Sequence, residues 1–184
     1  MTIWYISDLH WDHANIIEYS KRPFGSVEEM NETMIQRWNE WVKPQDHVWN
    51  LGDLTMHRQI GQIKYRILDR LNGHKRLILG NHDMDSIEHY AQYFEKIKGC
   101  HVHDNILFTH IPVHPESLGR FSANAHGHTH CNNYAPAIRH KRVNDKLDLT
   151  RPYKVPYVNV CVEQLDYRPI SLEELRLRIE HAKG

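Results

Sequence analysis

The chain has 184 residues, a length that suits one domain with a substantial core. Its 23 basic and 23 acidic residues balance, so the overall charge indicates neither a nucleic-acid nor a membrane partner. No apolar run approaches the roughly 20 residues that a membrane-spanning helix needs. Histidine is the outlier, with 16 residues scattered along the chain, and this pattern favours metal ligands or acid–base chemistry.

The cysteines and the first motif indicate the compartment. Cys100, Cys131 and Cys161 lie far apart and form no CxxC pair, which predicts free thiols in a reducing compartment. Candidate functional residues begin at Asp8, too early to follow a cleaved signal peptide. We therefore expect a cytoplasmic protein without a membrane partner, folded as one domain over residues 1–184. The sequence does not indicate the oligomeric state.

The first predicted strand covers Thr2 to Ser7 and is rich in apolar residues. It ends in Asp8-Leu9-His10. Side chains two residues apart in an extended chain point the same way, so Asp8 and His10 can hold one ion. A turn aspartate beside an unrelated histidine is the alternative for these three residues alone.

A helix and a second strand follow. The capping box Ser26-Val27-Glu28-Glu29 predicts a helix that continues to about Val42. The apolar stripe of this helix is expected in the core and consists of Met30, Met34, Trp38 and Trp41. The second strand is predicted over residues 46–50 and leads to Gly52-Asp53. A further helix is predicted over about residues 59–71, ending at Asn72-Gly73.

The third predicted strand, Leu77 to Leu79, leads to Gly80-Asn81-His82-Asp83. Asn81 offers a neutral oxygen to a metal, and His82 offers a proton near neutral pH. Asp83 can hold that imidazole in one tautomer. A strand-to-helix turn with a capping asparagine is the alternative reading of these four residues in isolation.

The next segment predicts a short helix over residues 86–94 and then a hairpin. Its strands cover residues 96–103 and 106–109 and turn at Asp104-Asn105. His110 directly follows the second of these strands, so it lies just beyond a strand, as the earlier motifs do.

The last third of the chain contains one more histidine motif. A strand over residues 121–125 leads to Gly127-His128-Thr129-His130, where alternation places His128 and His130 on one side. Residues 132–156 form a long, basic and weakly structured segment, which either guides a polyanionic substrate or is a solvated surface loop. A strand over 157–162 and a helix that starts at the capping box Ser171-Leu172-Glu173-Glu174 complete the chain.

These motifs share a position, because each follows a predicted strand at the end where open α/β sheets place their sites. The side chains concerned are Asp8, His10, Asp53, Asn81, His82, His110, His128 and His130. Oxygen and imidazole donors suit borderline divalent metals, and the lack of a thiolate disfavours a structural zinc site. The number of ligands fits two ions that share the Asp53 carboxylate. Two such ions with two carboxylates leave a positive site, which suits a phosphoryl group.

The complete set of motifs resembles that of the calcineurin-like metallophosphoesterases in its order and spacing. The motifs are Asp8-x-His10, Gly52-Asp53, Gly80-Asn81-His82-Asp83, His110 and Gly127-His128-x-His130. The resemblance covers residues 3 to about 162, and the chain looks most like the small stand-alone bacterial and phage members. It implies an α/β (α+β) fold, in which helices flank a central β-sandwich and a dinuclear metal site lies at one rim.

The resemblance also implies a role for each motif residue. One ion would be held by Asp8, His10, Asp53 and His130, and the other by Asp53, Asn81, His110 and His128. Manganese is the first expectation for both ions, with Fe, Zn, Ni, Co or Mg as alternatives. A metal-bridging hydroxide would attack phosphorus in line, with His82 as the general acid oriented by Asp83. The expected substrate is a phosphate ester, and nucleotides and nucleic acids are candidate classes.

The chain departs from the family pattern after Asp53. Many members continue as Asp-x-x-Asp-Arg-Gly, with the arginine for phosphate, whereas this chain continues with Leu54-Thr55-Met56-His57-Arg58. A phosphodiester carries less charge than a monoester and depends less on such a cation. We therefore expect a phosphodiesterase in preference to a phosphomonoesterase or protein phosphatase. A binding scaffold without catalysis is a further alternative, which the retention of every ligand and of His82 disfavours.

Overall fold

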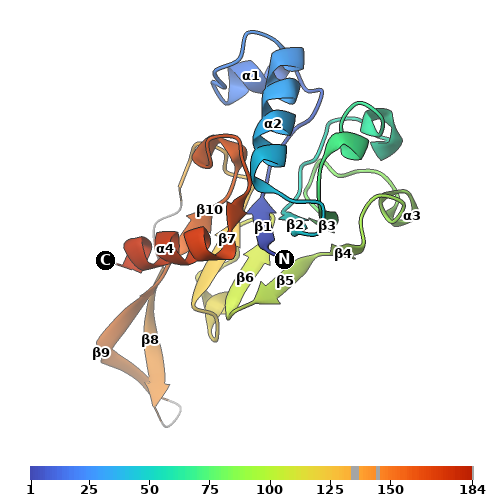
Figure 1. The fold of residues 1–184 in the computed structure, drawn as a ribbon. Helices are drawn as coiled ribbons and strands as arrows, with labels where there is room; N and C mark the ends of the chain where they lie inside the picture. Colours follow the sequence, from blue (N-terminus) through green and yellow to red (C-terminus); the bar gives the residue numbers. More distant parts are fainter. Residues whose placement is uncertain (134–136, 144–145, 184) are drawn as a thin grey trace.

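The computed structural model describes residues 1–133, 137–143 and 146–183, and between residues 137 and 153 it describes the backbone alone. Two sheets with helices around them form most of the molecule (Figure 1). The first sheet has the order β11 (Ile170–Ser171), β1 (Ile3–Ile6), β2 (His47–Asn50), β3 (His74–Ile78) and β4 (Lys96–Lys98). The second has the order β10 (Tyr157–Asn159), β7 (Ala123–His126), β6 (Ile106–Thr109) and β5 (Cys100–His103). This arrangement confirms the predicted α/β fold.

The parallel strands of both sheets end at the same rim. Strands β1 to β4 run parallel in the first sheet, as do β6, β7 and β10 in the second. Just beyond β1, Ser7 forms a parallel bridge with Cys161, which lies just beyond β10. The N–H of Val162 donates to the carbonyl of Ser7 over 3.1 Å. The loops that follow the parallel strands of the two sheets therefore meet.

In the described part of the chain, four α-helices surround the sheets: α1 (Asn15–Tyr19), α2 (Val27–Trp41), α3 (Ile87–Tyr90) and α4 (Leu172–Lys183). Helix α2 begins as predicted, because the Ser26 hydroxyl accepts the N–H of Glu29 over 3.1 Å. Its Met30, Met34 and Trp38 are buried. The prediction for Trp41 is wrong, since this residue is 44% exposed. Trp41 is the last residue of the helix, where it packs under the guanidinium of Arg168.

Other predicted elements differ from the structure. The helix predicted over 86–94 is limited to Ile87–Tyr90, and the strand predicted over 157–162 to Tyr157–Asn159. The segment from 59 to 71 is not one helix, because it forms two short 3₁₀ turns over Ile60–Ile63 and Leu68–Arg70. A hydrogen bond from the N–H of Ile60 to Asp85 fixes its start, so tertiary contacts override the helical pattern. The predicted strand over 96–103 is two strands, since the chain bends at Gly99 and passes from the first sheet to the second.

The hairpin turn between β5 and β6 agrees with the prediction. Asp104 and Asn105 both have positive φ, 53° and 60°, as a two-residue hairpin turn of the favoured twist requires. Asparagine and aspartate tolerate this conformation better than other residues with a side chain. A local sequence signal therefore sufficed to place this turn.

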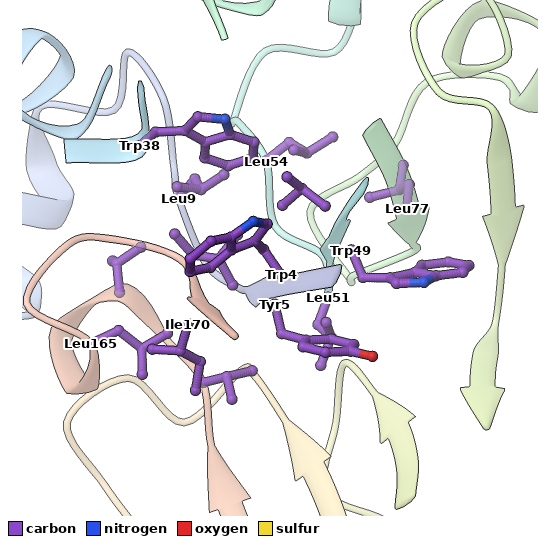
Figure 2. Close-up of a cluster of buried hydrophobic side chains, with 14 of the residues drawn as sticks. Trp4, Tyr5, Leu9, Trp38, Trp49, Leu51, Leu54, Leu77, Leu165 and Ile170 are labelled. Atoms are coloured by element: carbon purple, nitrogen blue, oxygen red, sulfur yellow. The ribbon is translucent and has the colours of Figure 1, made fainter. Parts of the chain in front are cut away.

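One large apolar cluster joins the first sheet to α2 and to the C-terminal segment (Figure 2). Trp4 and Tyr5 of β1, Trp38 of α2 and Ile170 of β11 belong to it. Tyr5 also stacks on Phe108 of the second sheet, with ring centroids 4.3 Å apart. This contact continues the core from one sheet into the other.

The basic segment that the sequence predicted to be weakly structured forms a third, two-stranded sheet. Its antiparallel strands are β8 (Ala137–Val143) and β9 (Lys146–Val155), and they project away from the two larger sheets (Figure 1). The side chains of residues 134–153 lie outside the described part of the structure. The role of guiding a polyanionic substrate is therefore untested. Among the described residues, no helix has both the length and the apolar character needed to cross a bilayer.

Helix α4 yields a prediction about stability. The Ser171 hydroxyl accepts the N–H of Glu174 over 3.1 Å, and Glu174 accepts the N–H of Ser171 over 3.0 Å. Ser171→Ala removes one of these two bonds, and we expect the free energy of unfolding in urea to fall by about 0.5–2 kcal/mol. Ser117→Ala, at an exposed serine, is the control and should change it by less than about 0.5 kcal/mol. An equal effect of both changes would contradict the capping role.

Candidate metal centre

Most of the predicted ligands lie in an unusual backbone conformation. The φ angles of Asp8, His10, Asp53, His128 and His130 are 58°, 50°, 56°, 69° and 48°. Aspartate and histidine visit this left-handed region more often than most residues, but each instance has a cost. Such outliers persist where the surrounding structure holds them, and they concentrate at functional sites. Here the five residues lie in the loops that follow β1, β2 and β7.

Two glycines allow the loops to approach one another closely. A Cβ atom at Gly127 would collide with the side chain of Ser7 and with the Asp8 carboxylate. A Cβ atom at Gly80 would collide with the Asp53 carboxylate and lie 2.5 Å from its backbone nitrogen. Glycine at these positions therefore allows the Gly127 motif to lie against Asp8 and the Gly80 motif to lie against Asp53.

The first group of candidate ligands is Asp8, His10 and His130, whose ligand atoms all lie within 4.8 Å of one another. The Nε2 atom of His130 lies 3.7 Å from Oδ1 of Asp8. Asp8 and His10 are buried, whereas His130 is partly exposed. The structure thus joins the loop after β1 with the loop after β7.

The second group is Asp53, His110 and His128, also with ligand atoms within 4.8 Å of one another. The Nε2 atom of His110 lies 3.4 Å from Oδ2 of Asp53 and 2.9 Å from Oδ1 of Asn81. The Nδ1 atom of His110 is 2.8 Å from the Leu51 carbonyl. That carbonyl can only accept, so Nδ1 carries a proton, and Nε2 is the ring atom that faces Asp53 and Asn81 and could bind an ion there.

Asp53 lies between the two groups. Its Oδ2 atom is 3.8 Å from Nε2 of His10 and 3.4 Å from Nε2 of His110. Its Oδ1 atom accepts the backbone N–H of His82 over 2.9 Å. Burial raises the pKa of Asp53, but its hydrogen bond and attraction to His110 outweigh burial and bring the pKa to about 2. The carboxylate is therefore negative at neutral pH and faces both groups.

The buried polar atoms of the first group fit a metal ion. Among the described residues, Oδ1 of Asp8 and both ring nitrogens of His10 are buried without a hydrogen-bond partner. Buried polar atoms usually have partners, and an ion supplies one where the protein does not. Burial, only partly opposed by Asp53, lowers the pKa of His10 to about 3. The ring is therefore neutral at pH 7, the form that binds metals.

His82 and Asp83 do not form the pair that the sequence predicted, in which Asp83 orients the His82 imidazole. The Nε2 atom of His82 lies 4.0 Å from Oδ2 of Asp53, and its side chain is 38% exposed. The carboxylate of Asp83 accepts the backbone N–H groups of Asp53, Leu54 and Gly80 over 2.9, 3.0 and 2.8 Å. Among the described contacts it has no bond to the His82 imidazole, so the expected orienting contact is replaced by one that ties two loops together.

The sequence analysis missed Glu163 and Arg22. Oε1 of Glu163 lies 3.0 Å from Nδ1 of His130, an arrangement that leaves Nε2 of that ring free to face Asp8. The buried guanidinium of Arg22 donates to Glu163 over 2.9 Å and to the Asp8 carbonyl over 2.7 Å. Arg22 and Glu163 are separated by 141 residues, and neither belongs to a local motif.

Cys161 is the third residue without a sequence signal. Its Sγ atom lies 3.2 Å from Oδ2 of Asp8, which also accepts the backbone N–H of His128 over 2.9 Å. Burial and then the charge of Asp8 raise the pKa of the Cys161 thiol. The thiol is therefore protonated and donates to Asp8. Two donors on Oδ2 leave Oδ1 of Asp8 directed at the first group.

A cavity of about 880 Å³ opens beside the two groups. His10, His82, His128 and His130 line it together with residues of α1 and the segment that precedes it, including His13 and Tyr19. No arginine or lysine lines it within the described part of the chain. His57 and Arg58, which follow Asp53 where many family members carry the arginine, do not line it either: His57 faces Asp12, with Nε2 3.5 Å from Oδ2, and Arg58 is exposed.

Comparison with known proteins places these observations in a family. Residues 1–173 match the calcineurin-like phosphoesterases. The uncharacterized protein MJ1445 of Methanocaldococcus jannaschii is 35% identical over 98% of this chain and 93% of its own length. The Gene 66 protein of Mycobacterium phage L5 is 43% identical over 44% of this chain and 39% of its own length.

A solved structure shares the fold. It is that of AQ665, a protein of unknown function from Aquifex aeolicus, and it aligns with a TM-score of 0.67 and 26% sequence identity. The alignment covers 96% of this chain and 98% of the other. With a family match over nearly the whole sequence, the chain belongs to the calcineurin-like phosphoesterase family.

Proposed function

We propose that this chain is a metal-dependent phosphodiesterase, organised as one domain, that holds two divalent ions at the rim where the two sheets meet. The observation that carries the proposal is the position of Asp53. One of its oxygens faces Nε2 of His10 in the first group and Nε2 of His110 in the second, at 3.8 and 3.4 Å. A carboxylate placed between two sets of ligands is suited to bridge two ions.

The remaining ligands follow from the same geometry. Asp8, His10 and His130 would complete the first ion's ligands, and Asn81, His110 and His128 those of the second. Oxygen and imidazole donors fit manganese, our first choice, and also Fe, Zn, Ni, Co or Mg. When bound, such ions lower the pKa of a coordinated water and stabilise charge on the phosphoryl oxygens.

We assign His82 as the proton donor to the leaving oxygen. It belongs to neither group of ligands, yet its ring lines the cavity beside Asp53. The hydrogen bond from the backbone N–H of His82 to Oδ1 of Asp53 holds the His82 backbone next to that carboxylate. The exposed side of the ring is open to substrate, and an imidazole is a side chain that can transfer a proton at neutral pH.

The lining of the cavity supports a diester substrate. Its polar side chains are histidines, asparagines and hydroxyls, and among the described residues no guanidinium or ammonium group reaches it. A monoester dianion gains from a fixed cation in addition to the metals, whereas a diester monoanion gains less. The volume of about 880 Å³ also leaves room for organic groups on both sides of a phosphate.

The first test concerns the bridge. Asp53→Asn removes the negative charge that both ions would share, so we expect loss of bound metal and of detectable hydrolysis. Metal content by mass spectrometry of the native protein and turnover of an aryl phosphodiester provide the measurements. Asp69→Asn, at an exposed aspartate, is the control and should leave both unchanged. Normal metal content and rate in Asp53→Asn would reject the dinuclear assignment.

The second test concerns His82. His82→Ala should keep its metal content while kcat falls by roughly 10²–10⁴, the usual contribution of general acid catalysis. The loss should be larger for a poor alkoxide leaving group than for nitrophenolate, which needs little protonation. His89→Ala, at an exposed histidine that pairs with Asp85, should have no such effect. If His82→Ala loses metal, or if the loss is independent of the leaving group, the assigned role is wrong.

The third test concerns the substrate class. We expect kcat/KM to be higher for an aryl phosphodiester than for the matched monoester, with the same metal and pH. The reason is the lack of a fixed cation among the described cavity residues. A clear preference for the monoester would reject the diester proposal and leave the metal assignment intact.

A further inference from the structure

A second set of metal-binding side chains lies at the opposite end of the first sheet. His47 and His74 are the first residues of β2 and β3, where they are partners in the parallel register. Glu95 immediately precedes β4, and its N–H donates to the Lys75 carbonyl over 2.9 Å. The candidate metal centre follows the carboxyl ends of the same strands, so the two sites are separated by the length of the sheet.

The three side chains converge. Each offers one ligand atom, and these atoms lie within 4.8 Å of one another. Nδ1 of His47 is 3.7 Å from Oε2 of Glu95, and Nδ1 of His74 is hydrogen bonded to Oε1. Tetrahedral zinc, with bonds of about 2.0–2.2 Å, separates its ligand atoms by roughly 3.3–3.6 Å. Small side-chain rotations therefore suffice to bring the three atoms to an ion.

His47 has a ring nitrogen available for such an ion. Its Nδ1 atom is buried and has no hydrogen-bond partner among the described residues. A neutral imidazole with a free lone pair is the form that coordinates a metal.

Arg76 is the competing partner of Glu95. Its Nε atom lies 3.8 Å from Oε2 of Glu95, and its guanidinium lies over the ring of Trp49, 5.8 Å from the centroid. The other carboxylate oxygen, Oε1, faces His74 instead. An ion bound through Oε1 therefore leaves the contact with Arg76 in place.

We propose that His47, His74 and Glu95 form a further divalent-metal site, one that binds Zn²⁺ or another ion with a preference for imidazole. Two imidazoles and one carboxylate provide three ligands, and the exposure of His74 and Glu95 leaves the fourth position to water. The ion joins the amino ends of β2 and β3 to the residue that precedes β4. Its role is to stabilise the sheet, at a distance from the phosphoesterase cavity.

The site is tested by comparing the number of zinc ions bound per chain by the intact wild-type protein and by variants of the proposed ligands. In equilibrium dialysis at micromolar Zn²⁺, His74→Asn and Glu95→Gln should each bind one ion fewer per chain than the wild type. His89→Asn should bind as many as the wild type. Added zinc should also raise the thermal midpoint of the wild type more than that of either variant. Hydrolysis by His74→Asn should be unchanged, because this residue lies far from the cavity.

The position of the ion provides a second measurement. Crystals grown with zinc should give an anomalous difference peak among His47, His74 and Glu95. Equal zinc counts in the wild type and both variants, or the lack of a peak at these residues, would overturn the proposal. Because the count is compared between variants, this result does not depend on how many ions the candidate centre binds.

Discussion

The close approach of the two sheets at one rim is the constraint on which the candidate centre depends. The bridge between Ser7 and Cys161 joins the end of β1 to the segment after β10. At Gly127 and Gly80 there is no space for a Cβ atom, because the carboxylates of Asp8 and Asp53 occupy it. The ligands therefore come from loops of both sheets, and neither sheet alone would assemble either group.

Buried charge at this rim is balanced in part by residues outside the motifs, namely Cys161, Arg22 and Glu163. Asp8 is fully buried and receives donors from His128 and Cys161 on the oxygen that faces away from the first group. Arg22 and Glu163 form a buried ion pair at 2.8 Å, and Glu163 also contacts His130. Buried ion pairs add little net stability, because desolvation offsets much of their attraction. The contribution of this pair is to orient two groups of the site: Glu163 contacts the His130 ring, and Arg22 donates to the Asp8 carbonyl.

Charge also distinguishes the two ends of the first sheet. The carboxyl end carries the carboxylates Asp8 and Asp53, and among the described residues its cavity has no fixed side-chain cation. Among the described residues that line the cavity, positive charge for a substrate would come from bound ions or protonated imidazoles. The amino end carries two histidines and Glu95 near Arg76. Clusters of imidazoles thus lie near both ends of the first sheet, one in the loops after β1, β6 and β7 and the other at the starts of β2 and β3.

Local patterns in the sequence were enough to predict the α/β class and the loops that carry the candidate ligands, because strand ends, capping boxes and the Asp104-Asn105 turn depend on neighbouring residues. The family was predicted from the resemblance of the whole motif set. The assignment of each ligand to an ion stays a prediction, although the structure brings these side chains together. The exposure of Trp41, the break of a predicted strand at Gly99 and the two 3₁₀ turns depend on tertiary packing. So do the partners of Asp83 and the bond between Arg22 and Glu163, which joins residues 141 apart. A spacing pattern reports only which side chains can share a face, whereas the folded chain decides which distant donor reaches which buried acceptor.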